Sequence, residues 1–352
     1  MMTVHPERAA GRSEREQPLL AVRGLRKYFP VKGGLFNRSV AMVQAVDEVS
    51  FEVREGEVLG IVGESGCGKS TTARLLMRLI EPDAGEVSFD GAAVGTRDGI
   101  STKELRRQVQ MVFQDSYSSL NPRLPVEDTI AFGPIVHGIG RTEAKERAYR
   151  LLGEVGLDPQ RFGRRYPHEL SGGQRQRINI ARALALRPKL VLLDEAVSAL
   201  DKSVEAQVLN LLLDLKKEFS LTYLFISHDL SVVHHISDRV LVMYLGKIVE
   251  IGPVDLVYNC PVHPYTRALL LSRPSMDPGD RKTEPPLSGD PPTPINPPSG
   301  CRFRTRCAYA EEVCERIEPT LFELDEHRNH QTACHMAVPG SGHSKAAAST
   351  TA

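Results

Sequence analysis

The stretch VLGIVGESGCGKST, residues 58–71, decides the fold. An apolar run is followed by a loop that matches G-x-x-x-x-G-K-[ST], and then by TARLLMRLI (72–80) with apolar residues at helical spacing. Glycines let backbone N–H groups wrap around phosphates, and the helix N-terminus adds the positive end of its dipole. The stretch therefore predicts a nucleotide site. Its expected nucleotide-binding residues are Gly63, Glu64, Ser65, Gly66, Cys67, Gly68, Lys69, Ser70 and Thr71.

Segments of strand and helix character alternate along the rest of the chain. The β-branched stretches 19–29 and 43–63 predict the first strands. Helical spacing covers 141–157, 178–186 and 204–219, and short apolar runs lie between, LVLLD (190–194), LTYLFIS (221–227) and RVLVMYL (239–245). Apolar runs of this length are typical of buried parallel strands. We therefore expect an α/β fold with a parallel core.

Composition limits the class of protein and its compartment. The 352 residues include 44 basic and 44 acidic side chains, so no net charge favours nucleic acid. The polar start of the chain lacks the apolar run of a signal peptide, and no window approaches 18 consecutive apolar residues. We expect a cytoplasmic protein, in which thiols stay reduced and structural disulfides are rare.

Two carboxylates end the predicted strand KLVLLDE (189–195). Strand ends are where α/β sheets bind ligands. Lys69 is expected to reach the β- and γ-phosphates and the Ser70 hydroxyl to ligate Mg²⁺. Asp194 is expected to hold the same ion through water, while Glu195 polarises the attacking water.

A second anion cradle is predicted at LSGGQ (170–174), where a Ser-Gly-Gly turn opens a helix. A single P-loop does not need two cradles. A dimer does, if the cradle of each subunit closes on the nucleotide of the other. The sequence therefore favours a dimeric nucleotide-hydrolysing protein.

The ordered motifs resemble those of ATP-binding cassette (ABC) ATPases: GESGCGKST, the Gln of VFQD, LSGGQ, LLDE, SALD and the His of FISHD. The resemblance covers about residues 19–270 and implies a RecA-like core, an antiparallel β subdomain and a helical subdomain near 117–186. It makes Gln114 the Q-loop glutamine, which would ligate Mg²⁺ together with Ser70 and Asp194. It makes His228 the switch histidine, which would be catalytic together with Glu195 and Lys69. It implies that Ser171, Gly172, Gly173, Gln174 and Asp201 contact ATP on the opposite subunit. Phe29, or less favourably Tyr28, would stack on adenine, and Ala196 departs from the usual proline without removing a catalytic atom.

Further features are similar to the ATPase subunits of oligopeptide and dipeptide permeases. These are SSLNPR (118–123), HPYTRALL (263–270), the insertion 30–43 and a cysteine-rich tail. The resemblance implies peptide import at the cytoplasmic face of the membrane. The partners would be a second, paralogous ATPase subunit, two permease subunits and an extracytoplasmic peptide-binding protein, with no nucleic acid. Importers of nickel share these features, and a soluble ABC ATPase acting on ribosomes or DNA, or a regulatory cassette with an inactive site, are further alternatives.

Four of the six cysteines lie late in the chain: Cys301, Cys307, Cys314 and Cys334. Their spacing C-x₅-C-x₆-C-x₁₉-C leaves zinc, an iron–sulfur cluster or free thiols open. Nearby arginines, Arg302, Arg304 and Arg306, would favour thiolates. The permease resemblance favours a [4Fe–4S] cluster on these cysteines, with a structural or sensing role.

The chain is thus expected to consist of several parts. A disordered tail spans 1–16, and the ATPase domain spans 17–270. A Pro-rich linker of polyproline-II character covers 271–300. A cysteine-rich metal-binding module (301–338) and a disordered tail (339–352) follow.

Overall fold

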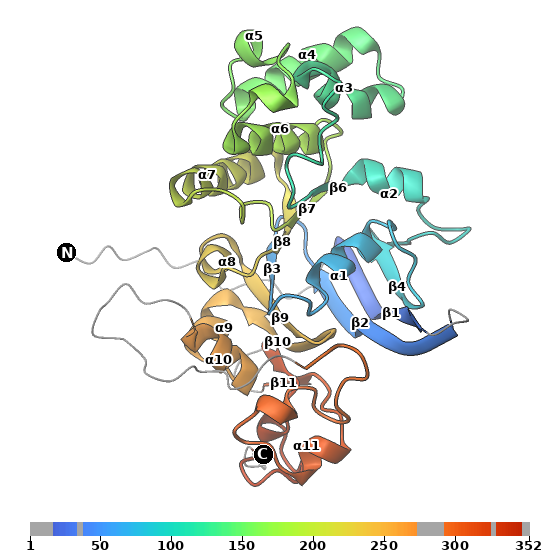
Figure 1. The fold of residues 1–352 in the computed structure, drawn as a ribbon, viewed down its shortest axis with the longest axis vertical. Helices are drawn as coiled ribbons and strands as arrows, with labels where there is room; N and C mark the ends of the chain where they lie inside the picture. Colours follow the sequence, from blue (N-terminus) through green and yellow to red (C-terminus); the bar gives the residue numbers. More distant parts are fainter. Residues whose placement is uncertain (1–16, 34–37, 273–291, 325–328, 347–352) are drawn as a thin grey trace, which may run out of the picture.

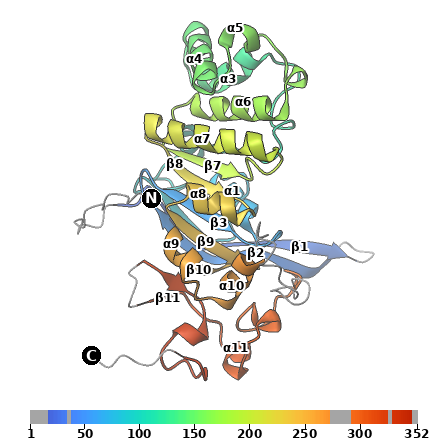
Figure 2. The ribbon, with the colours of Figure 1, turned by 90° about the vertical axis from the view of Figure 1, so that its left-hand side faces the viewer.

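The computed structural model describes residues 17–33, 38–272, 292–324 and 329–346. The predicted tail 1–16, most of the predicted linker and residues 347–352 lie outside the described residues. Figures 1 and 2 show an elongated molecule with a group of helices at one end and the sheets in the middle. The C-terminal segment, meaning residues 292–324 and 329–346, lies at the other end.

An eight-stranded sheet forms the centre, in the order β11-β12-β10-β9-β3-β8-β7-β6. Its bounds are β3 Val58–Val62, β6 Val109–Val112, β7 Leu190–Asp194, β8 Thr222–Ile226, β9 Arg239–Tyr244, β10 Lys247–Pro253, β11 Phe322–Glu323 and β12 Gln331–Thr332. The five strands from β9 to β6 are parallel, and β10, β12 and β11 add antiparallel pairs at one edge. Every residue of β3, β7 and β8 is buried, which explains their unbroken apolar sequences.

A second, antiparallel sheet has the order β2-β1-β4-β5. Its strands are β1 Leu20–Gly33, β2 Arg38–Val53, β4 Ala84–Phe89 and β5 Ala92–Ala93. Helix α1 (Lys69–Leu76) follows β3, and one apolar cluster extends from this sheet through α1 to the central sheet. This packing places the start of α1 between the two sheets.

The helical part lies between β6 and β7 in sequence. It contains α3 Val126–Val136, α4 Arg141–Glu154, α5 Pro159–Phe162, a 3₁₀ turn Pro167–Glu169 and α6 Gly172–Leu184. The flanking helices are α2 Thr102–Gln108, α7 Lys202–Phe219 and α8 Leu230–Ile236. Figure 1 shows α3, α4, α5 and α6 together at the top, with α7 between α6 and the sheet.

The end of the chain folds back onto the central sheet. After α9 (Val254–Asn259) and α10 (Pro264–Leu271), the described C-terminal residues contain α11 (Glu312–Arg316) and short 3₁₀ turns at Arg304–Arg306 and His335–Ala337. Strand β12 pairs with β10, so the last segment contributes to the sheet that carries the phosphate loop.

The expected α/β class with a parallel core is confirmed, and both the antiparallel sheet and the helical part are present. Within the described ranges, no helix has the length and apolar character needed to span a bilayer.

Candidate active site

The phosphate loop leaves β3 at Gly63 and ends at Gly68, immediately before α1. Both glycines have positive φ angles, 149° and 109°. A Cβ atom at Gly63 would lie 2.2 Å from the Met243 carbonyl oxygen, and one at Gly68 would lie 2.2 Å from that of Ala45. Any larger residue would therefore push the loop off the underlying strands.

Lys69 closes this loop. Its Nζ donates hydrogen bonds to the carbonyl oxygens of Gly63 (2.7 Å) and Glu64 (3.0 Å), and the residue is buried. The N-terminus of α1 has Gly68 as its cap residue and no side-chain cap. First-turn N–H groups without a capping side chain attract anions, as the predicted phosphate site requires.

The Ser70 hydroxyl donates a 2.8 Å hydrogen bond to Oδ1 of Asp194 at the end of β7. Burial raises the pKa of Asp194, and the neighbouring Glu195 raises it further, while the bond from Ser70 opposes this. Two of the three predicted Mg²⁺ ligands therefore lie together, although they are 124 residues apart in sequence. A hydroxyl and a carboxylate oxygen are the hard donors that Mg²⁺ prefers.

Glu195 lies where three strand ends meet. Its backbone N–H donates to Ile226 O at the end of β8 (2.9 Å), and its φ is 49°. Its carboxylate accepts a 2.7 Å hydrogen bond from Gln114 Nε2 and lies 3.4 Å from His228 Nδ1. The structure thus brings together the carboxylate predicted to polarise water, the switch histidine and the Q-loop glutamine. The direct bond from Gln114 to Glu195 was not foreseen from the motifs.

The LSGGQ turn is built as a reciprocal capping box. Ser171 Oγ accepts from Gln174 N (3.3 Å), and Gln174 Oε1 accepts from Ser171 N (3.0 Å). A Cβ at Gly173 would lie 2.6 Å from Val204 in α7, so the starts of α6 and α7 pack closely. Asp201 is the cap residue of α7. The two predicted trans-acting segments therefore form one surface. Figures 1 and 2 show α6 among the upper helices and α1 beside the sheets, in different regions of the chain.

Phe29, the predicted adenine-stacking residue, lies half-buried in β1, opposite Val43 of β2. The Lys27 ammonium lies 5.6 Å from its ring centroid. The alternative Tyr28 instead directs its hydroxyl to Asp47 Oδ1 (2.5 Å). Both rings are half-buried, and the choice of Phe29 as the adenine-stacking residue stays a prediction.

The four late cysteines line one small cavity of the C-terminal segment. The pKa of Cys301 is raised to about 12 and that of Cys334 to about 11, chiefly by burial and in smaller part by the neighbouring cysteines. The arginines between Cys301 and Cys307 therefore do not lower the pKa of Cys301 or Cys334, contrary to the expectation from sequence. Among the described residues, no group of three or more His, Cys, Asp or Glu is arranged to hold a metal ion, so the predicted metal centre is not supported.

The sequence patterns of two protein families match the chain. The family described as "ABC transporter" matches residues 46–198, which contain the phosphate loop, Gln114, LSGGQ and Glu195. The family described as "Oligopeptide/dipeptide transporter, C-terminal region" matches residues 249–314, which include three of the four late cysteines.

Similar proteins extend over most of the chain. A probable peptide ABC transporter ATP-binding protein, y4tS of Sinorhizobium fredii, is 51% identical over 91% of this chain and 90% of its own length. The oligopeptide transport ATP-binding protein AppF of Bacillus subtilis is 50% identical, and the di/tripeptide transport ATP-binding protein DppF of Pseudomonas aeruginosa is 46% identical. Both matches cover 91% of this chain and 98% of the relative.

Solved structures agree with this fold. That of cbiO1 from Clostridium perfringens, part of the ABC transporter complex cbiONQ, gives a TM-score of 0.59 at 27% identity over 70% of this chain and 92% of that one. The ATP-binding cassette MJ0796, a dimer in a post-hydrolysis state with ADP and Pi, gives 0.57 at 28% identity over 67% and 98%.

Proposed function

The chain belongs to the family of ABC transporter ATP-binding proteins, and we propose that it hydrolyses ATP to drive the import of oligopeptides or dipeptides. The observation that carries the ATPase assignment is the meeting of Gln114, Glu195 and His228 beside the Ser70–Asp194 pair. The match of residues 249–314 to the oligopeptide/dipeptide transporter region supports a peptide as the solute.

In the proposed reaction, water attacks the γ-phosphorus. The bond from this phosphorus to the oxygen that bridges it to the β-phosphate breaks, and ADP and phosphate leave. Glu195 orients the water and accepts its proton. Lys69 exchanges its bonds to loop carbonyls for bonds to the phosphates, and His228 stabilises the transferring group. Ser70, Asp194 and Gln114 would hold Mg²⁺, which when bound would neutralise charge on the phosphate oxygens. Phe29 stacks on adenine.

The Ser171–Gln174 turn and Asp201 act on the nucleotide of a second ATPase subunit. The exposed capping box at the start of α6 supports this, since it lies in a different region of the chain from its own phosphate loop. We propose that this second subunit is a paralogue. ATP bound between the subunits closes the dimer, and hydrolysis reopens it.

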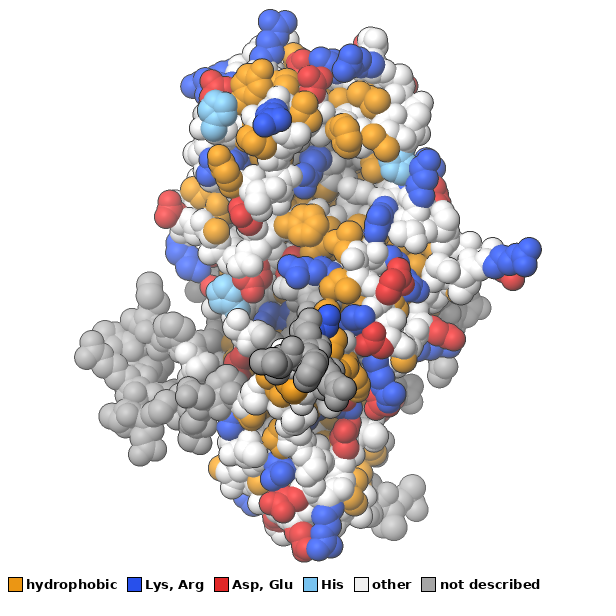
Figure 3. Space-filling model, turned by 45° about the vertical axis from the view of Figure 1, so that its right-hand side comes forward, with side chains coloured by type: hydrophobic (Ala, Val, Ile, Leu, Met, Phe, Trp, Pro, Cys, Tyr) orange, Lys and Arg blue, Asp and Glu red, His pale blue; other side chains and the backbone are white. Residues whose placement is uncertain are grey.

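The helical part is the proposed contact with two membrane permease subunits. Tyr117, Phe132 and Val136 are exposed by 53%, 61% and 56%, and exposed apolar side chains that gather in a patch mark interaction sites. Figure 3 shows hydrophobic side chains gathered among the helices at the top of the molecule. A short amphipathic helix from a permease would cover them and receive the motion of the Gln114 loop. This would hold the protein at the cytoplasmic face of the cell membrane.

The test of this function is reconstitution in liposomes with the co-expressed permease subunits and second ATPase subunit. We expect a peptide delivered by an extracytoplasmic binding protein to stimulate ATP hydrolysis and to accumulate inside. Nickel accumulation without peptide transport would favour the nickel alternative. ATPase activity that rises only with RNA or DNA would refute transport.

We also propose that the four cysteines at 301, 307, 314 and 334 ligate a [4Fe–4S] cluster. All four line one cavity, and a cluster attaches its thiolates to separate iron atoms, so they need not stand as close as ligands of one ion. The boundaries 17–270 for the ATPase and 301–338 for the cysteine module belong to the same proposal. Anaerobic purification should give absorbance at about 400 nm and about four irons per chain. One equivalent of zinc without colour would refute the cluster.

A further inference from the structure

Two arginines between Cys301 and Cys307 connect the C-terminal segment to the ATPase core, Arg306 at the phosphate loop and Arg302 at β2. Arg302 follows Cys301, and Arg306 precedes Cys307. Arg304, between them, stays with its own segment: its Nε donates to Ser299 O (2.9 Å), and its guanidinium lies 3.6 Å from Glu315. The two outer arginines turn instead toward the ATPase core.

Arg306 binds Glu64, the second residue of the phosphate loop. Its two terminal nitrogens donate to the two carboxylate oxygens over 2.8 and 3.1 Å, a bidentate pair of the strong kind. The Arg306 side chain is 6% exposed and that of Glu64 is 22% exposed. Water therefore screens this pair much less than a surface pair.

An aromatic cluster fixes the position of this pair. Phe303 packs edge-on against Tyr244 and tilted against Tyr265, with centroids 5.3 and 5.4 Å apart. The Tyr265 hydroxyl in turn accepts a 2.9 Å hydrogen bond from Glu64 N. The backbone of Glu64 is therefore held by Tyr265, which packs on the C-terminal segment. Its side chain is held by Arg306, which belongs to that segment.

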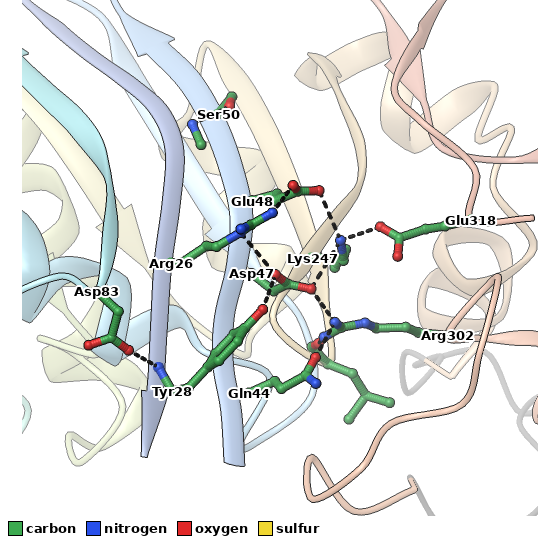
Figure 4. A network of polar contacts seen from close by, with 12 residues as sticks. Arg26, Tyr28, Gln44, Asp47, Glu48, Ser50, Asp83, Lys247, Arg302 and Glu318 are labelled. Atoms are coloured by element: carbon green, nitrogen blue, oxygen red, sulfur yellow. Dashed lines mark hydrogen bonds and ion pairs between the residues drawn. The ribbon is translucent and has the colours of Figure 1, made fainter. Parts of the chain in front are cut away.

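Arg302 makes the second connection. Its guanidinium donates to Asp47, to Gln44 Oε1 (2.6 Å) and to the Leu245 carbonyl. Asp47 also accepts the hydroxyl of Tyr28, the residue before Phe29. Figure 4 shows Arg302 entering from the C-terminal segment and Tyr28 from β1, with Asp47 between them. The C-terminal segment is thus anchored at β2, next to the strand that carries Phe29, as well as at the phosphate loop.

The charge of Glu64 explains why the phosphate loop needs such a partner. A free carboxylate in this loop would repel the triphosphate of ATP, and a bidentate guanidinium cancels that charge. We propose that Arg306, anchored by Arg302, is a positioning residue that neutralises Glu64 and thereby sets the ATP affinity of the phosphate loop. This inference rests on the proposed ATP site.

ATP dissociation constants of the full-length chain test this, measured by calorimetry in the non-hydrolysing Glu195→Gln background. We expect Arg306→Met to weaken ATP binding about tenfold or more, on the scale of a lost charged hydrogen bond. Arg306→Lys keeps the charge without the bidentate geometry and should lose less. Arg304→Met is the matched control from the same 3₁₀ turn and should bind ATP like the parent.

The decisive variant is Arg306→Met combined with Glu64→Gln. Removing the uncompensated carboxylate should restore affinity to within about threefold of the parent, which a general loss of folding would not allow. Equal affinity of the parent and Arg306→Met would overturn the inference, as would a loss that Glu64→Gln fails to relieve. A parent chain that binds no ATP would instead refute the proposed function.

Discussion

Glu250, in the middle of β10, is the residue whose replacement should destabilise the protein most clearly. Its carboxylate is completely buried and accepts three hydrogen bonds, from Val262 N (2.8 Å), His263 N (3.0 Å) and His330 Nε2 (2.8 Å). The donors come from the loop before α10 and from the C-terminal segment beside β12. One carboxylate therefore joins three segments that are distant in sequence.

We expect Glu250→Ala to lower the free energy of unfolding by about 3–5 kcal/mol, the usual cost of removing one partner of a buried pair. The variant leaves two backbone N–H groups and the His330 ring without their acceptor. Within the part of the chain that the structure describes, His330 Nδ1 has no hydrogen-bond partner, so the bond to Glu250 is the one that this ring makes there. Glu250→Gln keeps the shape and one acceptor oxygen and should cost about 1–2 kcal/mol.

Urea unfolding followed by circular dichroism measures these differences. Limited trypsin digestion adds the location, because His330→Ala should release the C-terminal segment first and expose its arginines to cleavage. A Glu250→Ala protein within about 1 kcal/mol of wild type would refute the reasoning, since it would mean that the orphaned donors find water at no cost. So would unchanged protease resistance of His330→Ala.

Three further predictions concern catalysis, assembly and pH. Glu195→Gln should lower the ATP hydrolysis rate by about 10²–10⁴-fold and leave ATP binding intact, because the phosphate loop is untouched; a phosphate-release assay beside calorimetry would show this. Ser171→Arg should abolish ATP-dependent dimerisation on size exclusion and still allow each chain to bind ATP; a retained dimer would contradict the trans role. Burial lowers the pKa of His263 to about 4 from 6.5, so the unfolded chain takes up this proton first as the pH falls. Stability should therefore drop by about 3 kcal/mol between pH 6.5 and 4, and His263→Asn, which can still cap α10, should lose this part of the pH dependence.

The central sheet and the phosphate loop could be predicted because their signals are local. The strands β3, β7 and β8 are buried along their whole length, so burial left unbroken apolar runs in the sequence. Gly63 and Gly68 have left-handed backbone conformations pressed against neighbouring carbonyls, and only glycine permits both. Such constraints act within a few residues, and the sequence therefore displays them.

Contacts between distant segments could not be predicted in the same way. Gln114 and Glu195 belong to two separate motifs, and nothing in either motif shows that one side chain bonds to the other across 81 residues. Strand β12 has two residues, too few for any periodicity, and it exists because β10 offers an open edge. The described residues likewise do not bear out the metal centre that the permease resemblance favoured and that the cysteine spacing had left open.

The arginines of RFRTR (302–306) were expected to favour thiolates at the neighbouring cysteines, and this expectation is wrong for a physical reason. Adjacent positive charge predicts acidic thiols, yet burial raises the pKa of Cys301 and of Cys307. The guanidinium groups of Arg302 and Arg306 are engaged elsewhere, with Asp47 and Glu64, which lie 255 and 242 residues away in sequence. A charge that is neutralised by a carboxylate does little for a neighbouring thiol. The two guanidinium groups therefore do not act on the cysteines, because they are paired with Asp47 in β2 and with Glu64 in the phosphate loop.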